Sequence, residues 1–229
     1  MSGDEGGDKA GDARAAARTP IDLPALAAIV EGMLAARPAS RRLIVGVAGA
    51  PGAGKSTAAA ALAALAPLGS VVLPMDGFHL PQAELVALGR RERMGAPDTF
   101  DVDAFVALLA SLRGVNNSGL TLHAPGFNRM IEEPVPDQIA LRPELSTVIV
   151  DGNYLLLAES GWQRVAPLLD LAIGVVLDDA TRHARLIARH IAFGKTPDAA
   201  RAWALGPDER NAVAIAATLE RADHLLSPP

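Results

Sequence analysis

The sequence predicts an α/β fold in which a mainly parallel sheet is covered by helices on both faces. Short apolar runs rich in branched residues alternate along the chain with longer stretches of helical periodicity. A glycine-rich loop joins the first apolar run directly to an alanine-rich helical segment. That first run is apolar almost throughout, which is typical of a strand buried on both faces of a parallel sheet.

Length and composition limit the possible classes of protein. The 229 residues favour one compact domain with insertions over two full domains. Because the chain has no cysteine, disulfide scaffolds, thiolate zinc sites, iron–sulfur clusters and thiol nucleophiles are excluded. A net charge of -5 and a total of eight aromatic residues argue against a protein that mainly holds nucleic acid.

The start of the chain differs from the rest. Residues 1–19 are predicted to form a disordered tail, because they are mostly small or charged and show no apolar periodicity. They contain no apolar stretch of the kind found in secretory signals, so we expect a cytoplasmic location. Residues 20–229 are expected to form a single domain. Apolar residues at helical spacing over 21–36 predict its first helix.

The later elements follow from the same patterns. Two arginines precede the first expected strand, residues 43–48, and a glycine follows it. Further strands are expected at 71–74, 120–123, 147–150, 172–177 and 224–226. Helical patterns lie between them at 57–66, 101–113, 160–169, 179–193 and 208–221. This alternation predicts crossover connections between parallel strands.

Residues 56–75 are as long as a membrane span and carry no charged side chain. However, Pro67, Gly69 and Pro74 interrupt this segment. We therefore expect a short helix, a turn and a strand here, with no contact between the protein and a membrane.

The strongest motif lies between the first strand and the helix that follows it. It satisfies the pattern G-x-x-x-x-G-K-[ST], which is typical of a phosphate-binding loop in this strand–loop–helix setting. The motif residues are Gly49, Ala50, Pro51, Gly52, Ala53, Gly54, Lys55, Ser56 and Thr57. A glycine-rich turn that matches by chance is the alternative, and the flanking strand and helix argue against it.

Each part of this motif suits a nucleoside triphosphate. Glycines let successive backbone N–H groups point at phosphate oxygens, and the following helix adds the positive end of its dipole. Lys55 is expected to reach the β- and γ-phosphates, and Ser56 to bind Mg²⁺. Eighteen of the 21 basic residues are arginines, yet the loop keeps a lysine. A compact ammonium on a flexible stem suits this position better than a planar guanidinium.

A carboxylate follows the next expected strand. Asp76 follows the expected strand 71–74, and carboxyl ends of parallel strands face the crevice where α/β proteins bind ligands. Asp76 is therefore a candidate to accept a proton from a hydroxyl group. The alternative is a turn residue, since Asp-Gly is an ordinary turn pair. The chain contains neither the N-K-x-D segment of guanine-specific GTPases nor the L-S-G-G-Q segment of transporter ATPases.

Several motifs in the same order resemble the uridine kinase, phosphoribulokinase and type I pantothenate kinase superfamily. The nearest group is the bacterial nucleoside/nucleotide kinase-like proteins often labelled fructose transport system kinases. The resemblance covers roughly residues 40–226. Besides the loop, it rests on M-D-G-F-H at 75–79, A-P-D-T-F-D at 96–101, P-G-F-N-R at 125–129, E-P at 133–134, V-D-G-N-Y-L-L at 150–156, R-L-I-A-R-H at 185–190 and D-E-R-N-A at 208–212.

The resemblance implies a three-layer P-loop NTPase fold with a helical lid at about 182–205. It also implies a kinase that moves the γ-phosphate of ATP to a hydroxyl of a small molecule. Asp76 would be the general base. Asp151 matches the Walker B position and would bind Mg²⁺, most simply through a water. The alternative for Asp151 is a turn residue before Gly152.

Three arginines after the last long strand form a further candidate group. Arg182, Arg185 and Arg189 are spaced so that they share one stripe of a helix. The resemblance favours Arg185 and Arg189 as lid arginines that stabilise charge during transfer. The alternative is a solvated helix face paired with neighbouring aspartates. Lys195 follows these arginines. Its ammonium group is expected to contact either phosphate or solvent, and both alternatives stay open.

For the acceptor pocket we expect Phe78, His79, Phe127 and Arg129, with a purely structural role as the alternative for His79. Uridine kinases carry an acidic residue shortly before the Pro-Asp pair that binds ribose hydroxyls, and Gly95 stands in that place here. Uridine is therefore not the expected acceptor, whereas a sugar, another nucleoside or a pantothenate-like alcohol stays open. A second hypothesis is a nucleotide-dependent regulator or chaperone that acts through a protein partner. The oligomeric state is open.

Overall fold

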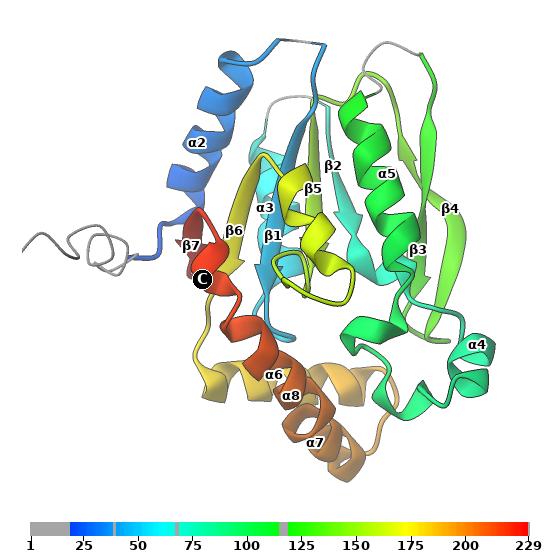
Figure 1. The fold of residues 1–229 in the computed structure, drawn as a ribbon. Helices are drawn as coiled ribbons and strands as arrows, with labels where there is room; N and C mark the ends of the chain where they lie inside the picture. The colour runs from blue at the N-terminus through cyan, green and yellow to red at the C-terminus, as the bar shows by residue number, and fades with distance from the viewer. Residues whose placement is uncertain (1–18, 39, 67–68, 115–118, 229) are drawn as a thin grey trace, which may run out of the picture.

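The computed structural model of the protein describes residues 19–38, 40–66, 69–114 and 119–228 (Figure 1). The expected tail, 1–19, lies outside these residues except for Thr19. Five strands within the described ranges form one sheet in the order β2-β5-β1-β6-β7, and every pair is parallel. Their bounds are Leu43–Gly49 for β1, Ser70–Pro74 for β2, Thr147–Gly152 for β5, Leu171–Val175 for β6 and His224–Leu226 for β7.

The central strands are apolar throughout because both faces of the sheet are covered. All residues of β1 and β5 are buried. Side chains along β1 alternate between two cores: Ile44 packs on one side, whereas Leu43 and Val45 pack on the other. A strand that contributes to both cores cannot carry a polar face, which explains the continuous apolar runs in the sequence.

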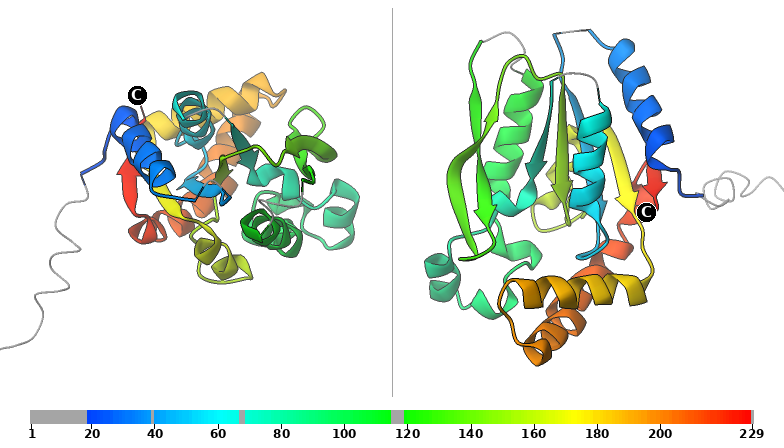
Figure 2. Two further views of the ribbon diagram at one scale, coloured as in Figure 1. Left: turned by 90° about the horizontal axis from the view of Figure 1, so that it is seen from above. Right: turned by 180° about the vertical axis from the view of Figure 1, so that it is seen from behind.

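Helices form the outer layers (Figure 2). Helices α2 (Leu23–Ala35) and α3 (Lys55–Leu65) supply Leu26, Val30 and Leu62 to the core on one face. Helix α5 (Val102–Gly114) and a group of aromatic side chains fill the other face. The three-layer arrangement that the sequence predicts is therefore confirmed.

The charge-free segment 56–75 divides as expected. Helix α3 ends at Leu65 and strand β2 begins at Ser70. Across the part of the chain that the structure describes, no helix combines the length and apolar character needed to cross a membrane.

Some sequence-based expectations are wrong. Residues 160–169 form two 3₁₀ turns, Trp162–Arg164 and Ala166–Leu168, and not a helix. Pro167 is the physical reason, because a proline has no N–H to continue a helical ladder. The strand expected at 120–123 is β3 (Leu122–Asn128), which pairs antiparallel with β4 (Glu133–Leu141) outside the parallel sheet.

Three elements are additional to the expected ones. Prolines in β4 hide its strand pattern, and the short helix α4 (Gln82–Ala87) has too few residues for a clear period. Helix α7 (Pro197–Leu205) lies between α6 (Asp179–Ala192) and α8 (Pro207–Ala216). We call α6, α7 and α8 the lid helices. Figure 1 shows them across the carboxyl ends of the parallel strands, and the expected lid 182–205 corresponds to most of α6 and α7.

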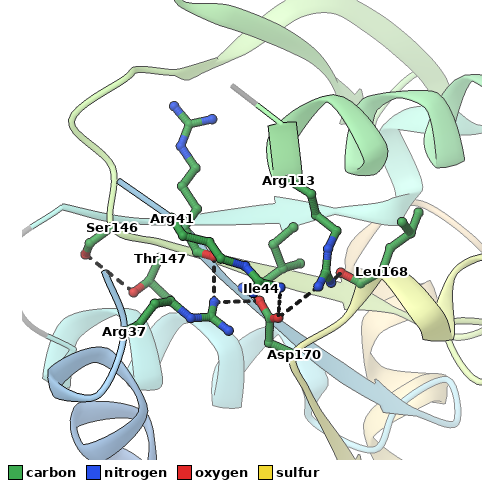
Figure 3. A network of polar contacts seen from close by, with 9 residues as sticks. Arg37, Arg41, Ile44, Arg113, Ser146, Thr147, Leu168 and Asp170 are labelled. Atoms are coloured by element: carbon green, nitrogen blue, oxygen red, sulfur yellow. Dashed lines mark hydrogen bonds and ion pairs between the residues drawn. The ribbon is translucent and has the colours of Figure 1, made fainter. Parts of the chain in front are cut away.

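A charged network joins the layers at the opposite end of the sheet (Figure 3). Asp170, just before β6, accepts hydrogen bonds from the Arg37 guanidinium at 2.7 Å and the Ile44 backbone N–H at 2.9 Å. Arg113 and Arg41 also pair with this carboxylate, at 3.3 and 3.5 Å. Burial would raise the pKa of Asp170, but the Arg37 and Ile44 hydrogen bonds outweigh it and hold the pKa below its usual value. One carboxylate thus connects α2, β1, α5 and β6.

Candidate active site

The phosphate loop lies between β1 and α3, at the carboxyl edge of the sheet. Gly52 and Gly54 have φ angles of 80° and 95°, which side-chain-bearing residues rarely adopt. A Cβ atom at Gly52 would lie 2.6 Å from Leu186 Cγ and 2.9 Å from the Arg182 carbonyl oxygen. Glycine at this position therefore shapes the loop and lets helix α6 pack directly on it.

The start of α3 is suited to an anion. Gly54, the residue before the helix, provides no side-chain cap. The first-turn residues Lys55, Ser56 and Thr57 all line a cavity above the loop. Uncapped N–H groups and the positive end of the helix dipole therefore lie at this cavity, as phosphate binding requires.

Lys55 is held close to the loop. Its Nζ donates a hydrogen bond to the Ala50 carbonyl oxygen at 3.0 Å. Burial lowers the pKa of Lys55, and the carboxylates of Asp151 and Asp76 oppose that effect. Phosphate oxygens would add further negative charge beside this ammonium and favour its protonated form.

Ser56 and Asp151 meet across the crevice. The Ser56 hydroxyl donates to Asp151 Oδ2 at 2.5 Å, although the two residues are 95 positions apart. Asp151 is only 7 % exposed, and no described residue donates a hydrogen bond to its other oxygen, Oδ1. Burial raises the pKa of Asp151, with Lys55 and the Ser56 hydroxyl opposing. A buried carboxylate oxygen without a donor, beside a serine hydroxyl, fits a divalent cation such as Mg²⁺.

Asp76 lies in the short 3₁₀ helix Met75–Phe78 that follows β2. Arg129 directly follows β3, and its Nη2 lies 2.6 Å from Asp76 Oδ2. Burial would raise the pKa of Asp76, but Arg129, followed by His79, Lys55 and Arg189, lowers it below its usual value. Asp76 is therefore an ionised carboxylate at neutral pH, in the state that a proton acceptor needs.

Two adjoining cavities define the site. The larger, which we call the nucleotide cavity, has a volume of about 580 Å³ and lies over the phosphate loop. The smaller, which we call the acceptor cavity, has a volume of about 120 Å³ and contains Asp76 and Asp151. The two cavities share four lining residues. These are Lys55, Ser56, Arg129 and Arg189.

This division separates two chemical tasks. The nucleotide cavity has the loop, the start of α3 and apolar side chains such as Leu23 and Leu226. The acceptor cavity has carboxylates, His79 and backbone groups. Cationic side chains line the place where the cavities meet, so a phosphoryl group that passed between them would be surrounded by positive charge.

The arginines of α6 separate into two groups. Arg185 lines the nucleotide cavity, and Arg189 lines both cavities. Burial lowers the pKa of Arg189, and the neighbouring Arg129 adds to this effect. Arg182 is 2 % exposed and lies apart from both cavities, because it forms ion pairs with Asp179 at 2.9 Å and Glu209 at 2.5 Å. The predicted stripe of three arginines thus places two side chains at the cavities and one in the packing of the lid helices.

The expected acceptor residues also separate. His79 and Arg129 line the acceptor cavity. Phe127 packs against the His79 ring, with 4.8 Å between ring centroids. Phe78 does not reach either cavity: it is 5 % exposed and packs edge-to-face on Phe105 in the core. The sequence predicted that Phe78 lines the acceptor site. The structure places it in the core instead, because the 3₁₀ turn directs its ring toward α5.

Lys195 contacts Glu132 and Trp203, which lie outside the phosphate loop. Its Nζ is 3.6 Å from a Glu132 carboxylate oxygen and 5.0 Å from the centre of the Trp203 ring. These contacts join the segment after α6 to α7 and to the β3–β4 hairpin. Lys195 lines neither the cavity over the phosphate loop nor the one beside Asp76, and its side chain is partly exposed.

Sequence reasoning did not assign a role to Asp208 and Asn211, which also line the acceptor cavity. Both come from α8, and they are three positions apart. That spacing places two side chains on one face of a helix, so the helical pattern at 208–221 could have indicated them. Gly95 lines the same cavity, and its carbonyl oxygen accepts hydrogen bonds from Tyr154 at 2.6 Å and Asn211 at 3.3 Å.

Comparisons with known proteins agree with this geometry. No protein-family model matches the chain. The chain is 35 % identical over 163 residues to a protein of Schizosaccharomyces pombe provisionally named uridine kinase, and the match covers 67 % of this chain and 68 % of the relative. This chain belongs to the uridine kinase-like P-loop kinases. It is also 38 % identical over 133 residues to an ATP-dependent kinase-like protein of Aspergillus versicolor, with 56 % of this chain and 77 % of that protein covered.

A solved structure extends the similarity within these P-loop kinases. The crystal structure of a protein from Silicibacter sp. TM1040, provisionally named fructose transport system kinase, has 36 % sequence identity and a TM-score of 0.79. The superposition covers 91 % of this chain and 100 % of that protein. The predicted family, the P-loop fold and the kinase class are therefore confirmed.

Proposed function

We propose that this P-loop kinase uses ATP and Mg²⁺ to phosphorylate a hydroxyl of a small molecule: a sugar, a nucleoside or a pantothenate-like alcohol. One observation carries the proposal. The carboxylate of Asp76 lies in the acceptor cavity, which meets the nucleotide cavity at Lys55 and Arg189. A base and a phosphate-binding loop on either side of a cationic junction suit phosphoryl transfer to an alcohol.

The chain supplies the binding of the triphosphate. Backbone N–H groups of the loop and of the first turn of α3 would bind the phosphates, with Lys55 at the β- and γ-phosphates. Ser56 and Asp151 would hold Mg²⁺, which when bound neutralises charge on the phosphate oxygens. The donorless oxygen of Asp151 supports this assignment.

The chemical step then requires one proton acceptor. The acceptor oxygen forms a bond to the γ-phosphorus, and the bond from that phosphorus to the bridging oxygen of ADP breaks. The proton of the attacking hydroxyl passes to Asp76. Arg129 keeps that carboxylate ionised, and Arg185 and Arg189 balance charge on the transferred group.

The test is to incubate the protein with ATP, Mg²⁺ and a panel of sugars, nucleosides and pantothenate, and to follow ADP release. The mass of each product shows whether a phosphoryl group has joined the acceptor. ADP release without any phosphorylated acceptor would contradict the proposal. Hydrolysis accelerated by a protein partner would instead support a nucleotide-dependent regulator or chaperone.

A further inference from the structure

We propose that the acceptor is a small uncharged polyol and that Asp208 binds a second hydroxyl near the one that is phosphorylated. The proposal deepens the proposed function and rests on it. Three features of the acceptor cavity carry it: its volume, the distribution of charge along its wall, and the hydrogen bonding of Asp208 and Asn211.

The size of the acceptor cavity favours a compact acceptor. The cavity has a volume of about 120 Å³, against about 580 Å³ for the adjoining nucleotide cavity. A short polyol or the reacting part of a sugar suits the smaller cavity better than a nucleoside, which has a planar base in addition to its sugar.

The charge along the wall disfavours an anionic acceptor. Among the described residues, every cationic side chain that lines the acceptor cavity also lines the nucleotide cavity. Residues that line the acceptor cavity alone include three carboxylates, from Asp76, Asp151 and Asp208, and two amides, from Asn153 and Asn211. With Asp151 assigned to Mg²⁺ and the cations of the junction to the phosphates, a carboxylate or phosphate group on the acceptor would face Asp76 and Asp208 and be repelled.

His79 does not change this balance. Its Nδ1 lies 2.8 Å from the Asp76 carbonyl oxygen, to which it donates. Burial lowers the pKa of His79, although Asp76 opposes this. A neutral imidazole that keeps one nitrogen for the backbone adds no positive charge for an anion. It can offer Nε2 to a hydroxyl.

Asp208 is positioned to accept a hydrogen bond from a ligand. It lies in the first turn of α8 and is 9 % exposed. His190 Nε2 is 2.7 Å from Asp208 Oδ2 and fixes the carboxylate. Within the described residues, nothing donates to the other oxygen, Oδ1. A nearly buried carboxylate oxygen that lines a cavity is a strong acceptor for a hydroxyl donor.

Asn211 completes this wall of the acceptor cavity. Asn211 lies one helical turn after Asp208, and its Nδ2 donates a hydrogen bond to the Gly95 carbonyl oxygen at 3.3 Å. Gly95 has a φ of 94°, and the Tyr154 hydroxyl donates to the same carbonyl. The loop around Gly95 is thus joined to α8, and Asp208 lines the same cavity as Asp76 and Asp151. Two carboxylates in one small cavity can each accept one hydroxyl of the same polyol.

The experiment compares acceptors and variants. The panel contains glycerol, D-ribose and D-fructose with their single-deoxy analogues, and D-glycerate, uridine and pantothenate for the other classes. We expect phosphorylation of at least one neutral polyol. For that polyol, Asp208→Asn should raise KM about 10- to 100-fold, the effect of losing a hydrogen bond to a charged group. KM for ATP should stay within about twofold.

Two controls separate recognition from folding. Asp198→Asn makes the same change at an exposed position of α7 and should leave both KM values unchanged. The deoxy analogue that lacks the second hydroxyl should bind equally weakly to the wild type and to Asp208→Asn. If Asp208→Asn does not fold, Asn211→Ala and the wild-type comparison of polyol with deoxy analogue test the same wall. Calorimetric titration of the polyol, with a non-hydrolysable ATP analogue present, measures binding without transfer.

The outcomes distinguish this inference from the proposed function. Phosphorylation of uridine, pantothenate or D-glycerate but of no neutral polyol would overturn the inference and leave the proposed function standing. An Asp208→Asn variant with unchanged KM for the polyol would also overturn it. An absence of any phosphorylated product across the panel would overturn both.

Discussion

At the scale of single residues, the proposed chemistry depends on a carboxylate that forms an ion pair with another side chain. Asp76 and Arg129 are 53 positions apart and form an ion pair at 2.6 Å. Arg129 lines both cavities and Asp76 lines the acceptor cavity, so the pair lies beside the cationic junction between them. If Asp76 is the base, as we propose, the acceptor hydroxyl shares this carboxylate with Arg129.

The first prediction concerns Asp76 itself. Asp76→Asn should lower kcat by about 10²- to 10⁴-fold, the usual contribution of a general base, while ATP binds with unchanged affinity. Lys55→Ala should weaken both ATP binding and transfer. Turnover and a nucleotide titration measure the two effects. Asp137→Asn is the matched control, because this exposed residue has a φ of 56°, which asparagine tolerates. Undiminished transfer by Asp76→Asn would exclude Asp76 as the base.

The second prediction uses the pKa of Asp76. Because a base works only when ionised, activity should fall at low pH as this carboxylate is protonated. Arg129 holds the pKa of Asp76 below its usual value, so the acid limb of kcat/KM lies at low pH in the wild type. Arg129→Gln removes that cation, and the acid limb should move to higher pH. An acid limb that stays in place would show that Arg129 does not control the ionisation of Asp76.

At the scale of elements, the phosphate loop and the lid helices are built against one another. Gly52 contacts Leu186 of α6, and Arg182 joins α6 to Glu209 of α8. The Arg182–Glu209 hydrogen bond lowers the pKa of Glu209. The ion pair therefore stabilises the packing of the lid helices at pH values above the usual pKa of a glutamate. Packing of α6 on the loop places Arg185 and Arg189 over the phosphate site.

The third prediction tests this packing. Gly52→Ala should lower ATP affinity, because the new Cβ meets Leu186 and the Arg182 backbone and because the φ of 80° is strained. Gly89→Ala is the control: its φ is 66°, and no atom lies within 4 Å of the added Cβ. Both variants carry the backbone cost of about 1–2 kcal/mol. Equal effects of the two substitutions on nucleotide affinity, measured by titration, would contradict a specific contact between loop and lid.

At the scale of the whole molecule, the two ends of the sheet have different roles. The carboxyl end carries the loop, Asp76 and Asp151, whereas the opposite end carries the Asp170 network that joins α2, β1, α5 and β6 (Figure 3). This separation lets a rigid scaffold support a site whose residues come from distant segments.

The fourth prediction concerns the Asp170 network. Asp170→Asn should reduce the free energy of unfolding by about 2–4 kcal/mol, because buried hydrogen bonds to charged groups are lost. The substitution should leave KM for ATP unchanged. Asp103→Asn is the control, since Asp103 pairs with Arg164 but its side chain is 85 % exposed. Removal of such a surface pair should cost about 1 kcal/mol or less.

The same network predicts a pH dependence. The pKa of Asp170 is lower in the folded state than in the unfolded chain, so its contribution to stability is complete above the unfolded pKa of about 3.9. It is lost as the pH falls below that value. Urea unfolding at a series of pH values should show a smaller loss of stability at acid pH for Asp170→Asn than for the wild type. Parallel pH profiles would contradict the assignment.

The sequence predicted the strands of the parallel sheet to within a few residues, together with the loop and the place of Asp76 at the carboxyl end of β2. These features depend on neighbouring residues: apolar runs, glycines before a lysine, and a carboxylate directly after a strand. The two 3₁₀ turns at 162–168 and the hairpin of β3 and β4 were predicted wrongly or not at all. Prolines and short lengths obscure their periodicity.

What the sequence by itself determined is therefore the local chemistry: a phosphate loop, an alternating α/β order and a likeness to kinases. The tertiary structure decided which distant side chains meet. It joined Arg129 to Asp76, directed Arg182 away from both cavities and Phe78 into the core, and brought Asp208 to the acceptor cavity. The physical reason is that such contacts depend on how helices pack on a sheet, which no local pattern of residues records.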